Sequence, residues 1–177
     1  MSEIGALILN RTDLADKVSH AKASGLTIVL ANGCFDLFHV GHVRYLNGAK
    51  AIGDILVVAI NSDRQTRLLK GEGRPFMPEN ERAEIISSLR CVDIVTIFDE
   101  PTVEGLLRAI KPDLHAKGTD YTTDTVPERE IVWEYGGKVA IVGDPKDHSS
   151  TSLIEIVKVG TDTRGRRDAE RILKCQS

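Results

Sequence analysis

The stretch that decides the fold of this chain spans residues 27–50 and reads TIVLANGCFDLFHVGHVRYLNGAK. Its first residues, 27–30, are β-branched or apolar and favour a strand, which breaks at Asn32 and the glycine after it. A segment with helical spacing follows, and His39 and His42 lie where it begins. The first N–H groups of a helix are unpaired and its dipole is positive there, so this junction predicts a phosphate site.

The rest of the chain alternates apolar runs with amphipathic segments. Strands are expected at residues 27–31, 55–61, 92–98, 113–117 and 138–142. Helices are expected at residues 12–24, 41–52, 63–69, 79–89, 101–110, 127–135 and 151–159. Thr12 or Asp13 can cap the first helix, and Pro101 suits the first turn of the fifth. We predict an α/β fold, a doubly wound parallel sheet of about five strands with helices on both faces.

Composition narrows the classes of protein. With 177 residues and 41% hydrophobic content, the chain predicts one domain over residues 1–159 and a charged tail over 160–177 with some helical character. A net charge of −3 argues against a broad nucleic-acid face. No apolar run approaches a membrane span, and the N-terminus lacks a signal-peptide layout. The three cysteines, Cys34, Cys91 and Cys175, are widely spaced, which favours reduced thiols in a cytoplasmic protein.

Polar clusters follow the expected strands or open the expected helices. They lie at residues 32–42, 61–63, 70–74, 117–121 and 143–152. In an open parallel sheet, ligands bind beyond the carboxyl ends of the strands near the point where the strand order reverses. The sequence therefore predicts that these clusters converge on one active site.

The histidines divide into a pair and three isolated residues. His39 and His42 are three residues apart, so both can face an anion bound at the start of their helix. A metal pair is the rival interpretation, but no further ligands appear at metal-binding spacing, and we predict no metal site. We interpret the others, His20, His115 and His148, as structural.

Two more segments are candidates for phosphate binding. The loop at 70–78 is rich in glycine and proline and carries Lys70 and Arg74, which are either solvated surface charges or a lid over a triphosphate. The run Ser150, Thr151 and Ser152 is either an ordinary helix cap or a further set of phosphate ligands.

These parts suit nucleotidyl transfer. The chain has no nucleophile elbow and no phosphate-binding loop of the GxxxxGK[ST] type. If a phosphate oxygen of the substrate attacks the α-phosphorus of a nucleoside triphosphate, no protein nucleophile is needed. Catalysis then consists of positioning and charge stabilisation, with Mg²⁺ bridging the phosphates as pyrophosphate leaves.

The GCFDLFHVGH stretch resembles the HxGH signature of the nucleotidyltransferase superfamily, which includes cytidylyltransferases and adenylyltransferases. The likeness continues through GDILVVAINSD, KGEGRP, NERAEIISSL, VDIVTIFDE, KPDLHAKGTDY and the late STS. Over roughly residues 10–158 the chain is similar to the adenylyltransferase domains of ADP-heptose synthases. The HxGH motif is specific for the superfamily, and the combination of the other motifs indicates the subfamily.

The resemblance implies a role for individual residues. It implies that His39, His42 and Lys70 are catalytic and stabilise the transferring phosphate. The nucleotide would be bound by Asn32, Gly33, Cys34, Phe35, Gly41, Arg74, Gly118, Asp120, Ser150, Thr151 and Ser152. The other substrate would be bound or organised by Asp36, Asp63 and Arg82.

The resemblance also implies a Rossmann-like fold, a homodimer, and ATP as substrate with Mg²⁺ carried on it. The reaction would transfer AMP to a sugar 1-phosphate, D-glycero-D-manno-heptose 1-phosphate, with pyrophosphate released. The alternative is a CTP-dependent enzyme acting on glycerol 3-phosphate or another alcohol phosphate. Those enzymes carry an RTEGIST-type segment, where this chain has DPKDHSSTS with only Lys146 as a cation. A binding module without catalysis is a third interpretation, which the intact HxGH pair and Lys70 oppose.

Overall fold

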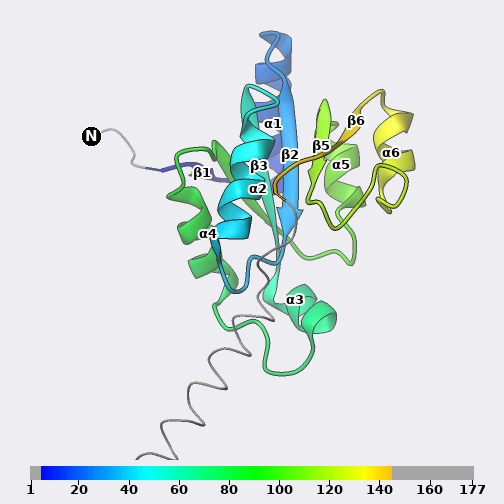
Figure 1. Cartoon of the computed structure of the whole chain (residues 1–177). Helices are drawn as coiled ribbons and strands as arrows, with labels where there is room; N and C mark the ends of the chain where they lie inside the picture. The colour runs from blue at the N-terminus through cyan, green and yellow to red at the C-terminus, as the bar shows by residue number, and fades with distance from the viewer. Residues whose placement is uncertain (1–4, 145–177) are drawn as a thin grey trace, which may run out of the picture.

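The computed structural model describes residues 5–144, which form a six-stranded parallel sheet with helices on both faces (Figure 1). The strands run in the order β1 (Leu7–Ile8), β4 (Ile94–Phe98), β3 (Ile55–Asn61), β2 (Ile28–Gly33), β5 (Leu114–Lys117) and β6 (Lys138–Ile141). The five predicted strands are all present. Strand β1 was not predicted, because it has only two residues at the sheet edge, paired with Ile94 and Val95.

The two central strands are buried on both faces, as their continuous apolar runs predict. In β2, Ile28 and Leu30 belong to one core, whereas Val29 and Ala31 belong to the core on the opposite face. Their neighbours in β3 follow the same alternation in register, with Val29 opposite Leu56. The sheet therefore separates two apolar layers, and its centre is a rigid base for the loops that follow it.

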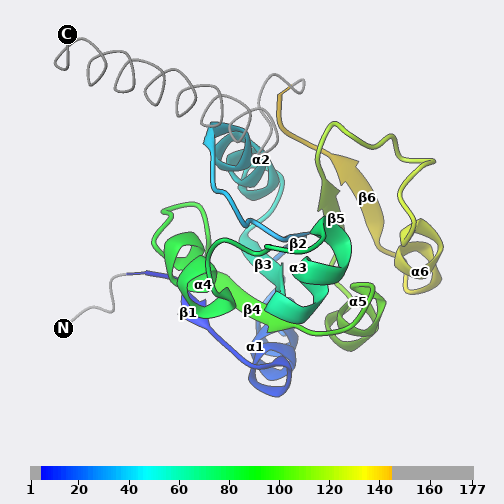
Figure 2. The same cartoon turned by 90° about the horizontal axis from the view of Figure 1, so that it is seen from below.

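The helices divide between these two layers. On one face lie α1 (Arg11–Ala23), α5 (Glu104–Ile110) and α6 (Arg129–Glu134), and on the other lie α2 (Val40–Lys50) and α4 (Glu79–Ser87) (Figure 2). The remaining helix, α3 (Asp63–Lys70), stands beyond the carboxyl end of β3. The predicted doubly wound sheet is confirmed, although the helix predicted at 151–159 and the tail at 160–177 lie outside the described residues.

Two predictions about helix starts are wrong. The N-cap of α1 is Asn10, whose side chain accepts a hydrogen bond from Asp13 N at 3.0 Å, rather than Thr12 or Asp13. Asparagine caps as well as aspartate does, so composition alone could not choose among adjacent candidates. Pro101 precedes α5 by a bend and a turn, because the N-cap there is Val103.

The strand order places the switch point between β2 and β5. The chain moves outward from β2 through β3 to β4, then returns to pair β5 with the other side of β2. The loops after β2 and β5 consequently leave in opposite directions and open a crevice at the carboxyl edge, where doubly wound sheets bind ligands. Asn32 and Lys117 lie at this edge, at the ends of those two strands.

We expect Gly53→Ala to destabilise the fold, because this glycine lies where the chain turns from α2 into β3. A Cβ at Gly53 would lie 2.4 Å from Val29 Cγ2 and 3.2 Å from Thr27 O, so core atoms would have to move. Overpacking of this kind costs about 1–3 kcal/mol of unfolding free energy, measurable by urea denaturation. The control is Gly105→Ala in α5, where the nearest atoms end flexible side chains, Glu100 and Arg11, and stability should hold or rise slightly. Equal stability of the two variants would contradict this expectation.

Candidate active site

A cavity of about 590 Å³ opens at the carboxyl edge of the sheet. Its lining includes Asn32, Gly33, Cys34, Phe35, His39, Gly41, His42, Arg44, Tyr45, Asn61, Lys70, Lys117, Gly118, Asp120, Tyr121, Glu128 and Asp144. Each of the five polar clusters expected to converge contributes at least one of these residues. The prediction that they meet at one edge is therefore confirmed for residues 5–144.

The two histidines of the HxGH motif cap the start of α2. His39 is the N-cap residue, and its Nδ1 accepts a hydrogen bond from Gly41 N at 3.1 Å. In return, His42 Nδ1 accepts from His39 N at 3.3 Å. A capping box ordinarily pairs Ser or Thr with Glu or Gln. Here imidazoles satisfy the same backbone donors, so the fold of the loop fixes both rings.

This capping also fixes the tautomer of each ring. Because Nδ1 accepts in both His39 and His42, the proton of each neutral imidazole is assigned to Nε2. Burial, followed by the charges of His39 and Lys70, lowers the pKa of His42 to about 4. At neutral pH, His42 is thus an uncharged side chain that can donate one hydrogen bond through Nε2.

Aromatic rings hold His42 in place. It stacks on His39 with ring centroids 3.9 Å apart and on Phe38 at 5.4 Å, and Phe35 meets it edge-on at 5.2 Å. Phe35 adopts a left-handed φ of 48° to reach this position. A Cβ on Gly33 would lie 3.2 Å from the ring of Phe35, so the glycine makes room for the ring that supports His42.

Lys70 supplies a cation to the same cavity. It is the last residue of α3 and is followed by Gly71, which ends the helix with a φ of 95°. Its side chain is exposed and lines the cavity, and its charge is felt by His42. One full positive charge and two imidazole donors therefore face the same space, which suits a polyphosphate.

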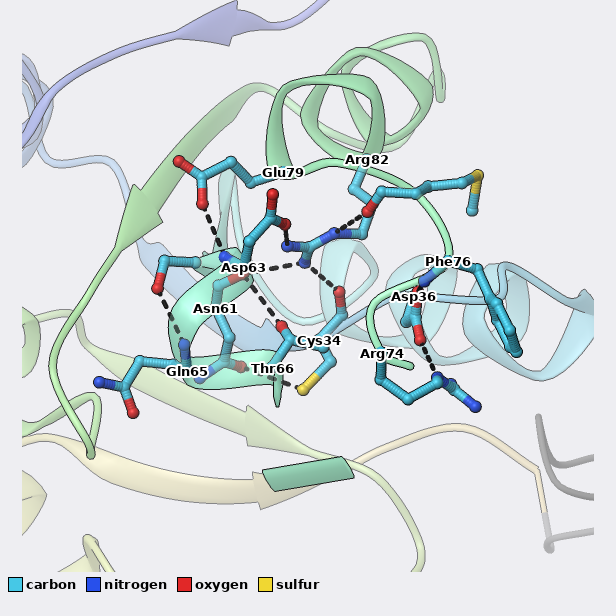
Figure 3. Close-up of polar contacts among 12 residues, drawn as sticks. Cys34, Asp36, Asn61, Asp63, Gln65, Thr66, Arg74, Phe76, Glu79 and Arg82 are labelled. Carbon is cyan, nitrogen blue, oxygen red and sulfur yellow. Dashed lines mark hydrogen bonds and ion pairs between the residues drawn. The ribbon is translucent and has the colours of Figure 1, made fainter. Parts of the chain in front are cut away.

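Arg74 does not line the cavity, unlike Lys70. Its guanidinium forms an ion pair with Asp36, whose side chain is 2% exposed, and lies 4.3 Å above the ring of Phe76 (Figure 3). Asp36 also accepts a hydrogen bond from Phe76 N at 2.5 Å. A buried carboxylate requires such partners, so the loop folds back onto residue 36 instead of presenting both cations to a ligand. This geometry suits an organising role for Asp36, and the predicted nucleotide contact of Arg74 stays a prediction.

Arg82 is buried beneath the site rather than exposed in it. Its side chain is 0% exposed, and Nη2 donates to Asp63 Oδ1 at 2.7 Å. Nη1 donates to Cys34 O at 2.5 Å and Asn61 O at 2.8 Å, while Nε donates to Met77 O at 3.0 Å (Figure 3). Neither Arg82 nor Asp63 lines the cavity. Both therefore tie together the segments that follow β2 and β3, which agrees with an organising role and leaves substrate contact a prediction.

The remaining predicted site residues fall into two groups. Gly118 and Asp120 line the cavity with the residues predicted at the end of β2 and the start of α2. Ser150, Thr151 and Ser152 lie outside the described residues.

Several cavity residues were not predicted. Arg44 and Tyr45 lie two and three residues after His42 in α2, and Arg44 forms an ion pair with Asp144 at 3.0 Å. Tyr45 donates to Ala116 O at 2.8 Å, and burial raises the pKa of its phenol. For Tyr45 the helical spacing from His42 was the available signal, because positions three residues apart share a helix face. Glu128 gave no such signal, since only the fold brings it to β5.

A buried polar network joins the ends of β2 and β5. Asn32 Oδ1 lies 3.1 Å from His115 Nε2 and accepts a hydrogen bond from Lys117 Nζ at 3.0 Å. Lys117 Nζ also forms an ion pair with Glu128 Oε2 at 3.2 Å. His115 is fully buried and absent from the cavity lining, so its predicted structural role is confirmed. The other three members line the cavity.

His115 should make the fold sensitive to acid. Burial, with the charge of Lys117 as a smaller cause, lowers its pKa to about 3, against an ordinary value of 6.5. Between about pH 6.5 and pH 3, His115 is protonated in the unfolded chain but neutral in the folded chain. Unfolding free energy should therefore fall with decreasing pH by up to about 1.4 kcal/mol per pH unit.

The measurement compares His115→Gln with the unaltered chain, because buried His42 and the carboxylates also titrate in acid. Urea denaturation of both proteins at pH 7, 6, 5 and 4.5 gives the difference in unfolding free energy at each pH. This difference should shift in favour of the variant as the pH falls. If the difference in unfolding free energy did not change with pH, the pKa of His115 would not be lowered by folding.

Residues 5–144 contain neither a metal-binding cluster nor a membrane-spanning helix. No group of three or more His, Cys, Asp or Glu side chains in that range is arranged to hold a metal ion. None of the helices in the same range is both long enough and apolar enough to cross a bilayer.

Comparison with known proteins gives one family. Residues 30–157 match the model of the family described as cytidylyltransferase-like. The bifunctional protein HldE of Pelobacter propionicus is 48% identical over 156 residues, which are 88% of this chain and 32% of that protein. HldE of Geobacter sulfurreducens is 46% identical over 150 residues, 85% of this chain and 31% of that protein. The chain thus spans about a third of the length of these curated relatives.

Two solved structures have a similar fold. A lipopolysaccharide core biosynthesis protein from Thermoplasma volcanium is 30% identical with a TM-score of 0.60, over 69% of this chain and all of that one. The pantoate-β-alanine ligase of Francisella tularensis, solved with β,γ-ATP and β-alanine, has a TM-score of 0.59 over 82% of this chain and 69% of that one. At 16% identity, the ligase supports the fold alone.

Proposed function

This chain belongs to the cytidylyltransferase-like family, and we propose that it transfers AMP from ATP to a sugar 1-phosphate. The product would be an ADP-sugar, with pyrophosphate released. The sequence motifs favour D-glycero-D-manno-heptose 1-phosphate as the acceptor. The relatives named HldE and the lipopolysaccharide core biosynthesis protein support this choice. The family match also confirms the resemblance of the HxGH stretch to the nucleotidyltransferase superfamily.

The observation that carries the proposal is the histidine pair at the start of α2. An oxygen of the sugar phosphate would attack the α-phosphorus of ATP, and the bond from that phosphorus to the pyrophosphate oxygen would break. The equatorial oxygens of the α-phosphate gain charge in this step, and preorganised donors stabilise it. His39 and His42 would donate from Nε2, since Nδ1 of each ring is used by the backbone.

Lys70 would act on the leaving group. Its ammonium is the exposed cation of α3 that shares the cavity with the histidines, and a lysine binds phosphate as a point charge. Pyrophosphate carries more negative charge once the bond to the α-phosphorus breaks, so a cation beside it lowers the barrier. Arg74, held by Asp36, would support the loop that follows Lys70.

Mg²⁺ would arrive with the triphosphate. Because residues 5–144 hold no cluster of three ligands, these residues fit a metal bound through phosphates and water better than a protein cage. Asp120 and Asp144 line the cavity and are the carboxylates near which such an ion would lie. The ion would neutralise phosphate charge, and the chain itself would orient the reacting groups.

The test measures pyrophosphate release with ATP or CTP and a panel of acceptors. We expect turnover with ATP and D-glycero-D-manno-heptose 1-phosphate. Turnover only with CTP and glycerol 3-phosphate would favour the alternative that the family description suggests. Nucleotide binding without turnover on any acceptor would favour a module that has lost catalysis.

The proposed enzyme would work in the cytoplasm as a homodimer. The reduced-thiol pattern of the sequence supports the compartment, and Cys34 and Cys91 are free thiols among the described residues. The subunit number rests on the family resemblance alone. Light scattering of the purified chain would measure it.

A further inference from the structure

We infer that Asn32 and Glu128 form an uncharged donor–acceptor subsite for the hydroxyl groups of a sugar ring, with Lys117 and His115 as positioning residues. The inference deepens the proposed function and rests on it for the identity of the two substrates. The ring is either the ribose of the nucleotide or the sugar of the acceptor. Both present neighbouring hydroxyls, which donate and accept hydrogen bonds.

Lys117 decides which way the Asn32 amide points. An ammonium group only donates, so the amide atom 3.0 Å from Lys117 Nζ must be the oxygen. The same oxygen lies 3.1 Å from His115 Nε2, which therefore carries the ring proton. The NH₂ group of Asn32 consequently points away from both donors. Since Asn32 lines the cavity, that NH₂ group is a donor available to a ligand.

Glu128 supplies the acceptor. Its Oε2 contacts Lys117 Nζ at 3.2 Å, which leaves Oε1 as the carboxylate oxygen away from the ammonium. The two side chains are 8% and 10% exposed, so little water screens their attraction and their charges cancel. Burial lowers the pKa of Lys117, and the neighbouring Glu128 carboxylate opposes that shift.

The charge of the cavity divides along the strand order. The phosphate-binding residues His39, His42 and Lys70 follow β2 and β3, whereas Lys117 ends β5 on the other side of β2. The side after β2 and β3 thus presents the Lys70 cation, whereas the Lys117–Glu128 pair beside Asn32 carries no net charge. A phosphate gains little from this neutral pair, but a hydroxyl matches it, because an adjacent donor and acceptor satisfy both of its roles.

Titration calorimetry tests the subsite with two variants. We expect Asn32→Ala and Glu128→Gln each to weaken binding of one substrate by about 3- to 10-fold, the range for loss of one hydrogen bond. ATP, 2′-deoxy-ATP and 3′-deoxy-ATP are titrated first, and then D-glycero-D-manno-heptose 1-phosphate is titrated into protein with ATP bound and Mg²⁺ withheld. Urea denaturation checks that each variant is folded. If Asn32→Ala does not fold, Glu128→Gln still tests the subsite.

The pattern of losses identifies the ring. A loss for ATP that disappears with one deoxy analogue assigns the subsite to ribose, and a loss for the sugar phosphate alone assigns it to the acceptor. Matched controls are Asn47→Ala on exposed α2 surface and Glu130→Gln, whose side chain is 77% exposed, and neither should change affinity. Unchanged affinity for both substrates in folded variants would overturn the inference, as would equal losses for ATP and both deoxy analogues. Because binding is measured without turnover, failure of the proposed reaction would be seen separately in the pyrophosphate assay.

Discussion

Replacing His42 with Ala is expected to lower kcat for pyrophosphate release by about 10²-fold or more while leaving nucleotide binding largely intact. The neutral imidazole donates one hydrogen bond, which is weak toward a ground-state phosphate that already has Mg²⁺ and water. It strengthens when charge accumulates on the α-phosphate oxygens. An interaction of this kind appears in kcat rather than in substrate affinity.

The low pKa of His42 determines how its substitution should differ from that of Lys70. With a pKa of about 4, the ring is neutral at pH 7, so in the proposed reaction it would orient the phosphate by a hydrogen bond without adding charge. Lys70 would supply the charge. Lys70→Ala should therefore weaken ATP binding as well as turnover, whereas His42→Ala should separate the two effects. Calorimetry with ATP and steady-state assays on both variants make the comparison.

Two controls isolate the chemistry from the capping of α2. His42→Gln keeps a side-chain acceptor at the position where capping boxes carry Glu or Gln, so the His39 N–H can remain satisfied. It should restore the stability lost in His42→Ala without restoring turnover fully. His20→Ala removes an exposed histidine of α1, bonded to Asp16 O at 2.7 Å, and should leave both properties unchanged. A His42→Ala enzyme with unaltered kcat would refute the role assigned to His42.

Local patterns in the sequence were sufficient for the sheet and for half of the cavity. Continuous apolar runs predicted β2 and β3 because both strands are buried on both faces. The histidine pair was predictable because its spacing and its place at a helix start are local properties. The two-residue β1 was not predictable, since pairing with β4 alone defines it.

Long-range electrostatics account for what the sequence could not show. In the sequence, Arg74 and Arg82 are both cations near a glycine-rich loop. In the structure, Arg74 pairs with Asp36, and Arg82 pairs with Asp63 and bonds backbone carbonyls. Lys117 and Glu128 lie on separate elements and meet only after β5 and α6 have packed. Such ion pairs form between residues far apart in the chain, so the periodicity of the sequence does not predict which residues pair.

Replacing Arg82 with Ala should cost about 3–5 kcal/mol of unfolding free energy, because several buried acceptors lose their donor at about 1–3 kcal/mol each. The guanidinium is wholly buried and bonds one carboxylate and three backbone carbonyls. Without it, Asn61 O and its neighbours lose their donors inside the protein, and unpaired buried acceptors are costly. Urea denaturation measures the loss.

Two further variants distinguish this network from a simple surface charge. Arg82→Lys retains the charge, but an ammonium has three donors without the planar fork, so it should recover only part of the stability. Arg64→Ala removes an arginine of α3 that is 63% exposed and pairs with Asp99 at 2.7 Å, and should change stability little. If Arg82→Ala were as stable as Arg64→Ala, the network would not hold the fold together.

Substitution of Arg82 should also alter the active site, because Arg82 bonds the backbone of residues that line it. Arg82 fixes Cys34 O and Asn61 O, and both of these residues line the cavity although Arg82 does not. In Arg82→Lys, assayed below its unfolding temperature, the loops after β2 and β3 would lose part of their alignment. Loss of alignment should lower kcat for every acceptor by a similar factor, because positioning errors affect the shared transition state. A change confined to the KM of the sugar phosphate would instead mean that Arg82 contacts that substrate directly, as its place in the motif first suggested.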